Sequence, residues 1–193
     1  MPATLLLIFA AILYRVAPVL LNLHSSWTEN FSPLASIVLC GAIFFPRNWA
    51  LYVPLVILAV SDVILNLFAY HAPLISWEIL PRYLALGAIG WMALYHRARL
   101  RPNSGLVFGA SLLGSTFFYG ATNIASWVGE AGYTKNFSGL VQSLTFGLEG
   151  YPPSYLFFRN SLVGDLLFTG LFLICMAATR PVAPAVEHQS VIA

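Results

Sequence analysis

The chain has 193 residues, of which 59% are hydrophobic and only 8% are charged. A soluble domain carries about 25% charged residues, so this composition excludes an ordinary water-soluble protein and indicates an integral membrane protein with one domain. The net charge of +2 is small and the arginines lie in short connecting segments, which argues against DNA or RNA as a partner.

The apolar stretches predict an all-α, polytopic membrane protein with six transmembrane helices in one bundle. A helix that crosses the bilayer perpendicularly needs about 20 mainly apolar residues. The second and fourth stretches are shorter, so we expect them to thin the bilayer locally or to begin inside a protein cavity. The predicted spans cover residues 3–23, 33–45, 49–70, 82–95, 105–127 and 160–179.

The connection over residues 128–159 is the longest between two predicted spans. A loop of this length is usually functional or folded on itself. Its apolar segment over residues 137–148 predicts a short interfacial or re-entrant helix. Residues 181–193 are predicted to form a disordered cytoplasmic tail.

The placement of arginine predicts the orientation. Arg97, Arg99 and Arg101 make one connection strongly basic, and the positive-inside rule puts that connection in the cytoplasm. Alternation of the spans then puts both termini on the cytoplasmic side. The longer connections lie outside, which is typical of a protein that meets a partner or caps a cavity at its outer face.

Five polar or charged residues lie inside otherwise apolar spans. Such side chains are unfavourable in hydrocarbon, so they tend to face the bundle interior or a cavity and to mark a site. At about 1.5 Å per residue, all five fall in the outer half of the membrane. They are Arg15, Asp62, Asn66, Asn123 and Asp165.

Two interpretations of this group remain open. In the first, Arg15 pairs with Asp62 or Asp165 in a structural ion pair that fixes helix register. In the second, the group lines a water-accessible pocket for a small polar solute. Arg159 would then stand at its rim and, with Arg15, could meet a carboxylate or phosphate of the solute. Trp91 lies near the middle of the fourth predicted span, where it would stack on a planar ligand or only pack against neighbouring helices.

Motifs that carry chemistry are missing from the sequence. We find no HExxH, CxxC or P-loop pattern. We therefore expect neither catalysis nor a metal or cofactor, and energy for transport would come from a partner, a gradient or trapping. A less favoured alternative is a membrane enzyme that acts on a lipid-linked substrate, with Asp62 or Asp165 as acid or base.

Four motifs, taken in order, resemble an uncharacterised family of bacterial membrane proteins, a domain of unknown function described as transport proteins. That family is similar to the substrate-binding S components of energy-coupling factor (ECF) transporters. The motifs are Asn30-Phe-Ser-Pro-Leu-Ala35, Val53-Pro-Leu55 followed by Ser61-Asp62, Ala121-Thr-Asn-Ile-Ala-Ser-Trp127, and Phe157-Phe-Arg-Asn-Ser-Leu-Val-Gly-Asp-Leu166.

The resemblance implies a six-helix protein of the bacterial cytoplasmic (inner) membrane that captures a small organic solute, such as a vitamin, from the outer face. It also implies an ECF coupling protein and ATPases as partners. Members that bind cobalt or nickel use a His near the N-terminus, whereas the first His here is His24, which disfavours a metal substrate. A structural six-helix membrane protein of a cell-shape complex is the alternative.

Overall fold

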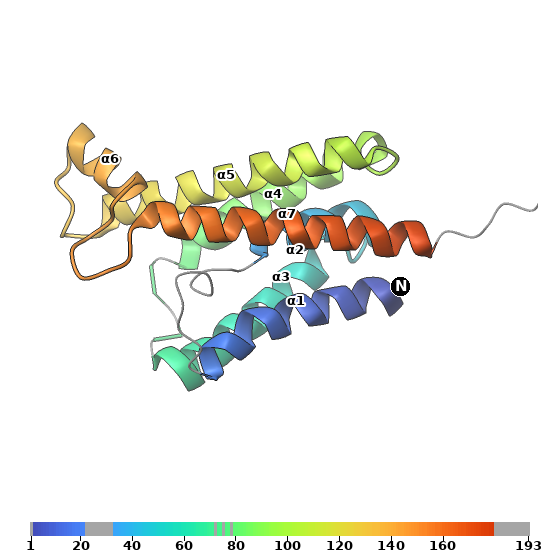
Figure 1. Cartoon of the computed structure of the whole chain (residues 1–193), viewed down its shortest axis with the longest axis horizontal. Helices are drawn as coiled ribbons and strands as arrows, with labels where there is room; N and C mark the ends of the chain where they lie inside the picture. Colours follow the sequence, from blue (N-terminus) through green and yellow to red (C-terminus); the bar gives the residue numbers. More distant parts are fainter. Residues whose placement is uncertain (1, 22–32, 72, 75, 78, 180–193) are drawn as a thin grey trace, which may run out of the picture.

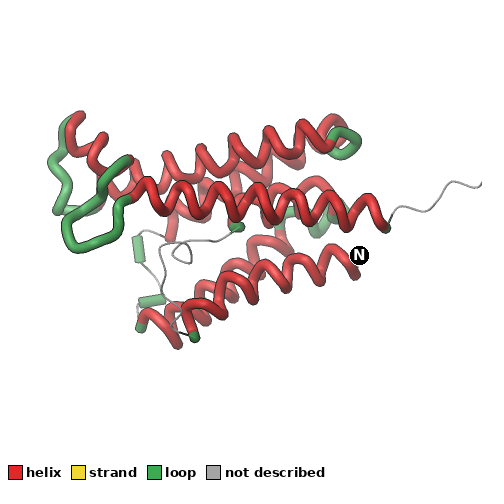
Figure 2. The backbone as a smooth tube through the Cα atoms, viewed as in Figure 1, coloured by secondary structure: helices red, strands yellow, loops and turns green. Residues whose placement is uncertain are grey.

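The computed structural model describes residues 2–21, 33–71, 73–74, 76–77 and 79–179. Within them the chain forms helices joined by short loops and contains no strand (Figure 2). The all-α prediction is therefore confirmed. The predicted tail over residues 181–193 lies outside the described residues.

The helices lie in or close to the predicted stretches, and the long outer connection contains a short helix as expected. The last turn of the third stretch is a π-helix, labelled η1. The elements are α1 (Pro2–Leu20), α2 (Leu34–Phe44), α3 (Tyr52–Leu65), η1 (Asn66–Tyr70), α4 (Ile79–Leu100), α5 (Ser104–Gly129), α6 (Phe137–Leu144) and α7 (Ser154–Ala178).

The number of membrane-spanning helices differs from the prediction of six. Of the described residues, three helical segments are long and apolar enough to cross a membrane: Tyr52–Ala69, Ser104–Gly129 and Ser154–Ala178. Helix α2 has 11 residues and is therefore only about 16 Å long, half of what a span needs. Helix α4 is long enough, but it carries Arg97 and Arg99 in its last turn and is too polar overall.

The bundle is built around α2. Helices α4, α5 and α7 run alongside one another, α1 and α3 form a second group, and α2 lies between the two groups (Figure 1). Every residue of α2 is buried, and the helix packs against α3, α4, α5 and α7. Its sequence, LASIVLCGAIF, is apolar on all sides, which is typical of a helix in the centre of a large core.

The two ends of the bundle differ. The start of α1, the α4–α5 connection and the end of α7 lie at one end, whereas α6 lies at the opposite end (Figure 1). The basic α4–α5 connection lies at the first of these ends, which the positive-inside rule predicts to face the cytoplasm. We call the end that holds α6 the outer end.

Two glycines of α4 provide a test of the packing against α2. A Cβ atom at Gly90 would lie 2.6 Å from both Val38 Cγ1 and Leu51 Cδ2, whereas a Cβ at Gly87 would meet nothing within 4 Å. We expect Gly90→Ala to lower the free energy of unfolding by about 1–3 kcal/mol through overpacking. Gly87→Ala should leave it unchanged or raise it by up to about 1 kcal/mol through helix propensity.

Thermal unfolding of the two variants in the same detergent measures this difference. The matched pair removes the general effect of adding a methyl group to a glycine of α4. Equal unfolding midpoints would show that α2 and α4 do not approach each other this closely.

Candidate functional site

Charged side chains from three helices meet around one carboxylate. Arg15 of α1 donates to Asp62 Oδ1 of α3 and to Ser61 Oγ. From α4, Arg82 Nη1 lies 3.4 Å from Asp62 Oδ2, and the Tyr83 hydroxyl donates to the same oxygen at 2.8 Å. We call these five residues the Asp62 cluster.

Residues that are consecutive in the sequence supply two pairs of the cluster. Ser61 and Asp62 are consecutive, so one turn of α3 presents both acceptors to Arg15. The Ser61 hydroxyl donates to the Leu58 carbonyl at 2.8 Å, which leaves its oxygen lone pairs for the guanidinium. Arg82 and Tyr83 lie in the first turns of α4, close to the outer end of the bundle.

The two arginines of the cluster differ in burial. The exposed fractions of the side chains are 11% for Arg15, 14% for Asp62 and 34% for Arg82. Two guanidinium groups face one carboxylate, so the net charge of the cluster is +1. The cluster is thus partly buried, open on the side of Arg82, and positively charged.

A second polar group lies around Asp165 of α7, which is completely buried. Asp165 Oδ1 accepts from the Ser36 backbone N–H at 2.8 Å, and Oδ2 accepts from Ser115 Oγ at 2.6 Å. The Thr169 hydroxyl donates to Ser111 Oγ at 2.9 Å in the adjacent turn. These five buried residues, the Asp165 cluster, join α2, α5 and α7.

The Asp165 carboxylate caps α2 from another helix. The first N–H groups of a helix have no partner within it, and the N-cap residue of α2 is Pro33, which makes no side-chain cap. A carboxylate at this position supplies the acceptor and also interacts favourably with the positive end of the helix dipole. Among the described residues no Arg, Lys or His forms an ion pair with Asp165, so its polar partners are the start of α2 and hydroxyl groups.

Among the described residues, the side chains of Asn66, Asn123 and Trp91 make no hydrogen bond or ring contact with either cluster, although the Asn66 backbone N–H donates to the Asp62 carbonyl one turn away. Asn123 Nδ2 donates to the Tyr119 carbonyl of its own helix at 2.8 Å, and Asn66 Nδ2 to the Pro73 carbonyl at 3.5 Å. The Trp91 side chain is 63% exposed and stacks on Tyr95, with ring centroids 6.1 Å apart. Trp91 therefore belongs to the outer surface of the bundle rather than to either cluster.

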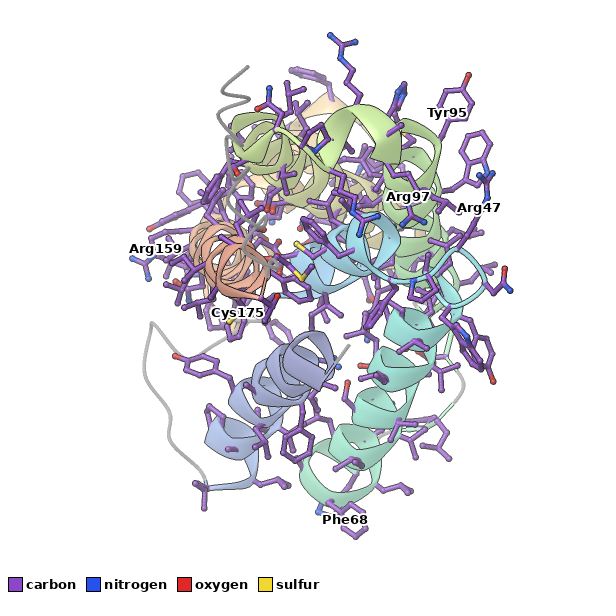
Figure 3. The ribbon with its side chains drawn as sticks, turned by 90° about the vertical axis from the view of Figure 1, so that its right-hand side faces the viewer. Arg47, Phe68, Tyr95, Arg97, Arg159 and Cys175 are labelled. Carbon is purple, nitrogen blue, oxygen red and sulfur yellow. The ribbon has the colours of Figure 1, made fainter. Side chains whose placement is uncertain are left out.

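Arg159 points away from the bundle at the surface of α7 (Figure 3). Its Nε donates to Asn160 Oδ1 of the next residue at 3.0 Å. Of the seven residues predicted to bind the solute, the structure thus brings Arg15 and Asp62 together. It puts Asp165 in a different cluster that shares no hydrogen-bond partner with the first.

Several members of the clusters were not predicted. Arg82 and Tyr83 lie at the outer end of the predicted fourth span, where a polar side chain carries no signal for a site. Ser111 and Ser115 are four residues apart and therefore share a helix face, a pattern that could have pointed to a polar contact. Ser36 was not predicted, because its backbone N–H donates to Asp165 at the start of α2, and no side-chain pattern indicates such a contact.

The two clusters favour different chemistry. Arginine binds carboxylate or phosphate through two parallel hydrogen bonds, so the Asp62 cluster suits an oxyanion. The Asp165 cluster is saturated by internal hydrogen bonds and suits a structural role. Within the described part of the chain, no group of three His, Cys, Asp or Glu residues is arranged to hold a metal ion.

Comparison with known proteins identifies a family for nearly the whole chain. The family described as "Family of unknown function (DUF6580)" matches residues 1–186. No curated protein and no solved structure matches the chain. Because the match covers most of its length, the chain belongs to this family of unknown function.

Proposed function

We propose that the protein is a membrane transport protein of the substrate-binding type, which holds a small organic solute at the Asp62 cluster. The observation that carries this proposal is the meeting of Arg15, Asp62 and Arg82 from three helices near the outer end of the bundle. Ionisable side chains within a membrane bundle mark substrate paths more often than they serve packing alone.

The surroundings of the cluster agree with solute capture from outside. Three described helices are long and apolar enough to cross a membrane, and large apolar side chains such as Leu84, Leu113 and Phe117 are exposed on the outer faces of the helices. In this proposal the protein lies in the bacterial inner membrane with both termini in the cytoplasm. The solute then reaches the cluster from the side on which α6 lies.

Energy for transport comes from elsewhere in this proposal. The sequence has no nucleotide-binding motif, and the resemblance to S components makes an ECF coupling protein with its ATPases the proposed partner. The residues of the Asp62 cluster bind and orient a solute in this scheme. They do not transfer a group, so the protein is not proposed to be an enzyme.

The first experiment is native mass spectrometry of the purified full-length protein, which looks for a co-purifying small molecule. Thermal unfolding against a panel of vitamins and metabolites follows. A solute that binds the folded state should raise the unfolding midpoint in a saturable manner. We expect such a shift in the wild type and an altered one in Asp62→Asn, because this variant changes the net charge of the cluster. Absence of both a co-purifying molecule and any shift would contradict solute binding.

A structural membrane protein of a cell-shape complex is the second candidate. The observation that favours it is the engagement of both Asp165 carboxyl oxygens in internal hydrogen bonds, which is what a buried polar residue with a purely structural role would make. This candidate predicts that no solute shifts the unfolding midpoint. It also predicts that the protein co-purifies with other membrane proteins under mild extraction.

A further inference from the structure

The two arginines of the Asp62 cluster are held in different ways. The Arg15 guanidinium donates to both Asp62 and Ser61, so it is fixed by two acceptors in a nearly buried position. Among the described residues, Asp62 alone accepts from Arg82, and the separation of 3.4 Å is long for a charged hydrogen bond. Arg82 is thus the loosely held and more exposed cation.

The hydrogen-bonding capacity of Arg82 is mostly unused within the described residues. A guanidinium has five N–H donors in a planar fork, and one of them reaches Asp62. Both Asp62 oxygens are already engaged, because Oδ1 accepts from Arg15 and Oδ2 accepts from Tyr83 at 2.8 Å. Asp62 therefore keeps two good partners when Arg82 moves away from it.

We propose that Arg82 is the residue that binds the solute, and that the solute carries one oxyanion group, a carboxylate or a phosphate monoester. This inference rests on the proposed solute-binding function and names the chemical class of the ligand. The oxyanion takes the fork of Arg82 in two parallel hydrogen bonds and neutralises the excess positive charge of the cluster. Arg15 stays with Asp62 as the fixed base of the site.

The arrangement also excludes classes of solute. A cationic solute or a bare metal ion would face two guanidinium groups with Asp62 already neutralised between them, and like charges at close range repel. Replacement of the weak Arg82–Asp62 contact by a bidentate pair adds a charge-assisted interaction without leaving Asp62 unpaired. The site should therefore prefer anions to neutral or cationic analogues of similar size.

The test uses the full-length protein in nanodiscs made of the zwitterionic lipid phosphatidylcholine. Thermal unfolding is measured with acetate, with inorganic phosphate and with the metabolite panel sorted by charge, at constant ionic strength. The variants are Arg82→Gln, which removes the charge, and Arg82→Lys, which keeps the charge without the fork. Arg99→Gln, an exposed arginine at the other end of α4, is the matched control.

We expect oxyanions to stabilise the wild type and Arg99→Gln alike. Arg82→Gln should weaken binding by roughly 10- to 100-fold, the loss of one charged hydrogen-bond pair, and Arg82→Lys should weaken it less. Binding of neutral or cationic solutes that survives in Arg82→Gln would overturn the oxyanion inference and leave the proposed function standing. If no solute of any charge binds, the proposed function fails as well.

A lipid headgroup is the other source of an oxyanion near the membrane surface. A parallel series in nanodiscs that contain phosphatidylglycerol separates the two sources. Stabilisation of the wild type by the anionic lipid, lost in Arg82→Gln and accompanied by no response to soluble anions, would assign Arg82 to a lipid. That result would overturn the inference of a soluble ligand.

Discussion

Replacement of Asp165 with alanine is expected to lower the free energy of unfolding by about 2–4 kcal/mol. The change removes the acceptor for the buried Ser36 N–H, whereas the Ser115 hydroxyl keeps the Ser111 carbonyl, at 2.9 Å, as an acceptor. Each buried donor left without an acceptor costs about 1–3 kcal/mol, and the missing carboxylate leaves a small cavity. Unfolding of the full chain in detergent, followed by tryptophan fluorescence, measures the loss.

Two further variants make this result specific. In Asp165→Asn the amide oxygen still accepts from Ser36 N–H, so we expect less than half of the loss seen with alanine. Thr116→Ala changes an exposed residue of α5 that follows Ser115 in the chain. The Thr116 hydroxyl donates to the Leu112 carbonyl of its own helix. It should stay within about 0.5 kcal/mol of the wild type. A similarly small effect of Asp165→Ala would mean that α2 is capped by another group.

The size of this effect follows from the position of α2. A half-length helix in the centre of a membrane bundle cannot satisfy its first N–H groups with water. The chain places Pro33 before the helix, which removes one donor but supplies no side-chain acceptor. Asp165 of α7 supplies the missing acceptor. Because it also bonds to Ser115, the same carboxyl group joins α2 to α5 and α7. One carboxylate thereby connects three helices of the core.

Hydrophobic stretches predicted most of the fold. The segment predicted over residues 33–45 contains α2 at Leu34–Phe44, because a continuous apolar run bounded by prolines has few alternatives. The start of α7 was less predictable. Arg159 and Asn160 suggested the mouth of a span at residue 160, whereas the helix begins six residues earlier, at Ser154. Pro152 and Pro153, just before it, were the better signal, since proline is favoured at a helix start.

This shift in α7 changes the depth of Asp165. The predicted span puts Asp165 about 8 Å from the outer end, whereas the observed helix puts it about 16 Å from its first residue. Depth alone does not separate Asp165 from Arg15. The face of α7 that carries Asp165 meets the start of α2 and Ser115 of α5, and the sequence does not determine that contact.

The composition of the Asp62 cluster was harder to predict than its existence. A charged residue in an apolar stretch is visible in the sequence, so Arg15 and Asp62 stood out. Arg82 and Tyr83 lie near the end of α4, where polar side chains are common and carry no signal. Helical periodicity indicates which residues share a face of one helix, but it does not determine which faces meet, and that is what brings α4 to Asp62.

Replacement of Asp62 with alanine is expected to lower the free energy of unfolding by about 3–5 kcal/mol, because Arg15 keeps a nearly buried charge without a counter-ion. Arg82 loses the same carboxylate, so two like charges then face each other across the site. Arg82→Gln should cost much less, since Arg82 is more exposed and its contact with Asp62 is long. Chemical unfolding of the three proteins in one detergent gives the ranking.

The double variant Arg15→Met with Asp62→Leu separates folding from binding. Replacement of a buried ion pair by apolar residues of similar size is often neutral or stabilising, so this variant should recover most of the stability that Asp62→Ala loses. A double-mutant cycle with the two single variants then gives the coupling energy of the pair. If the recovered protein no longer responds to solutes that stabilise the wild type, the ion pair serves binding. If it responds unchanged, the pair only fixes the register of α1 and α3, and Arg82 binds the solute without it.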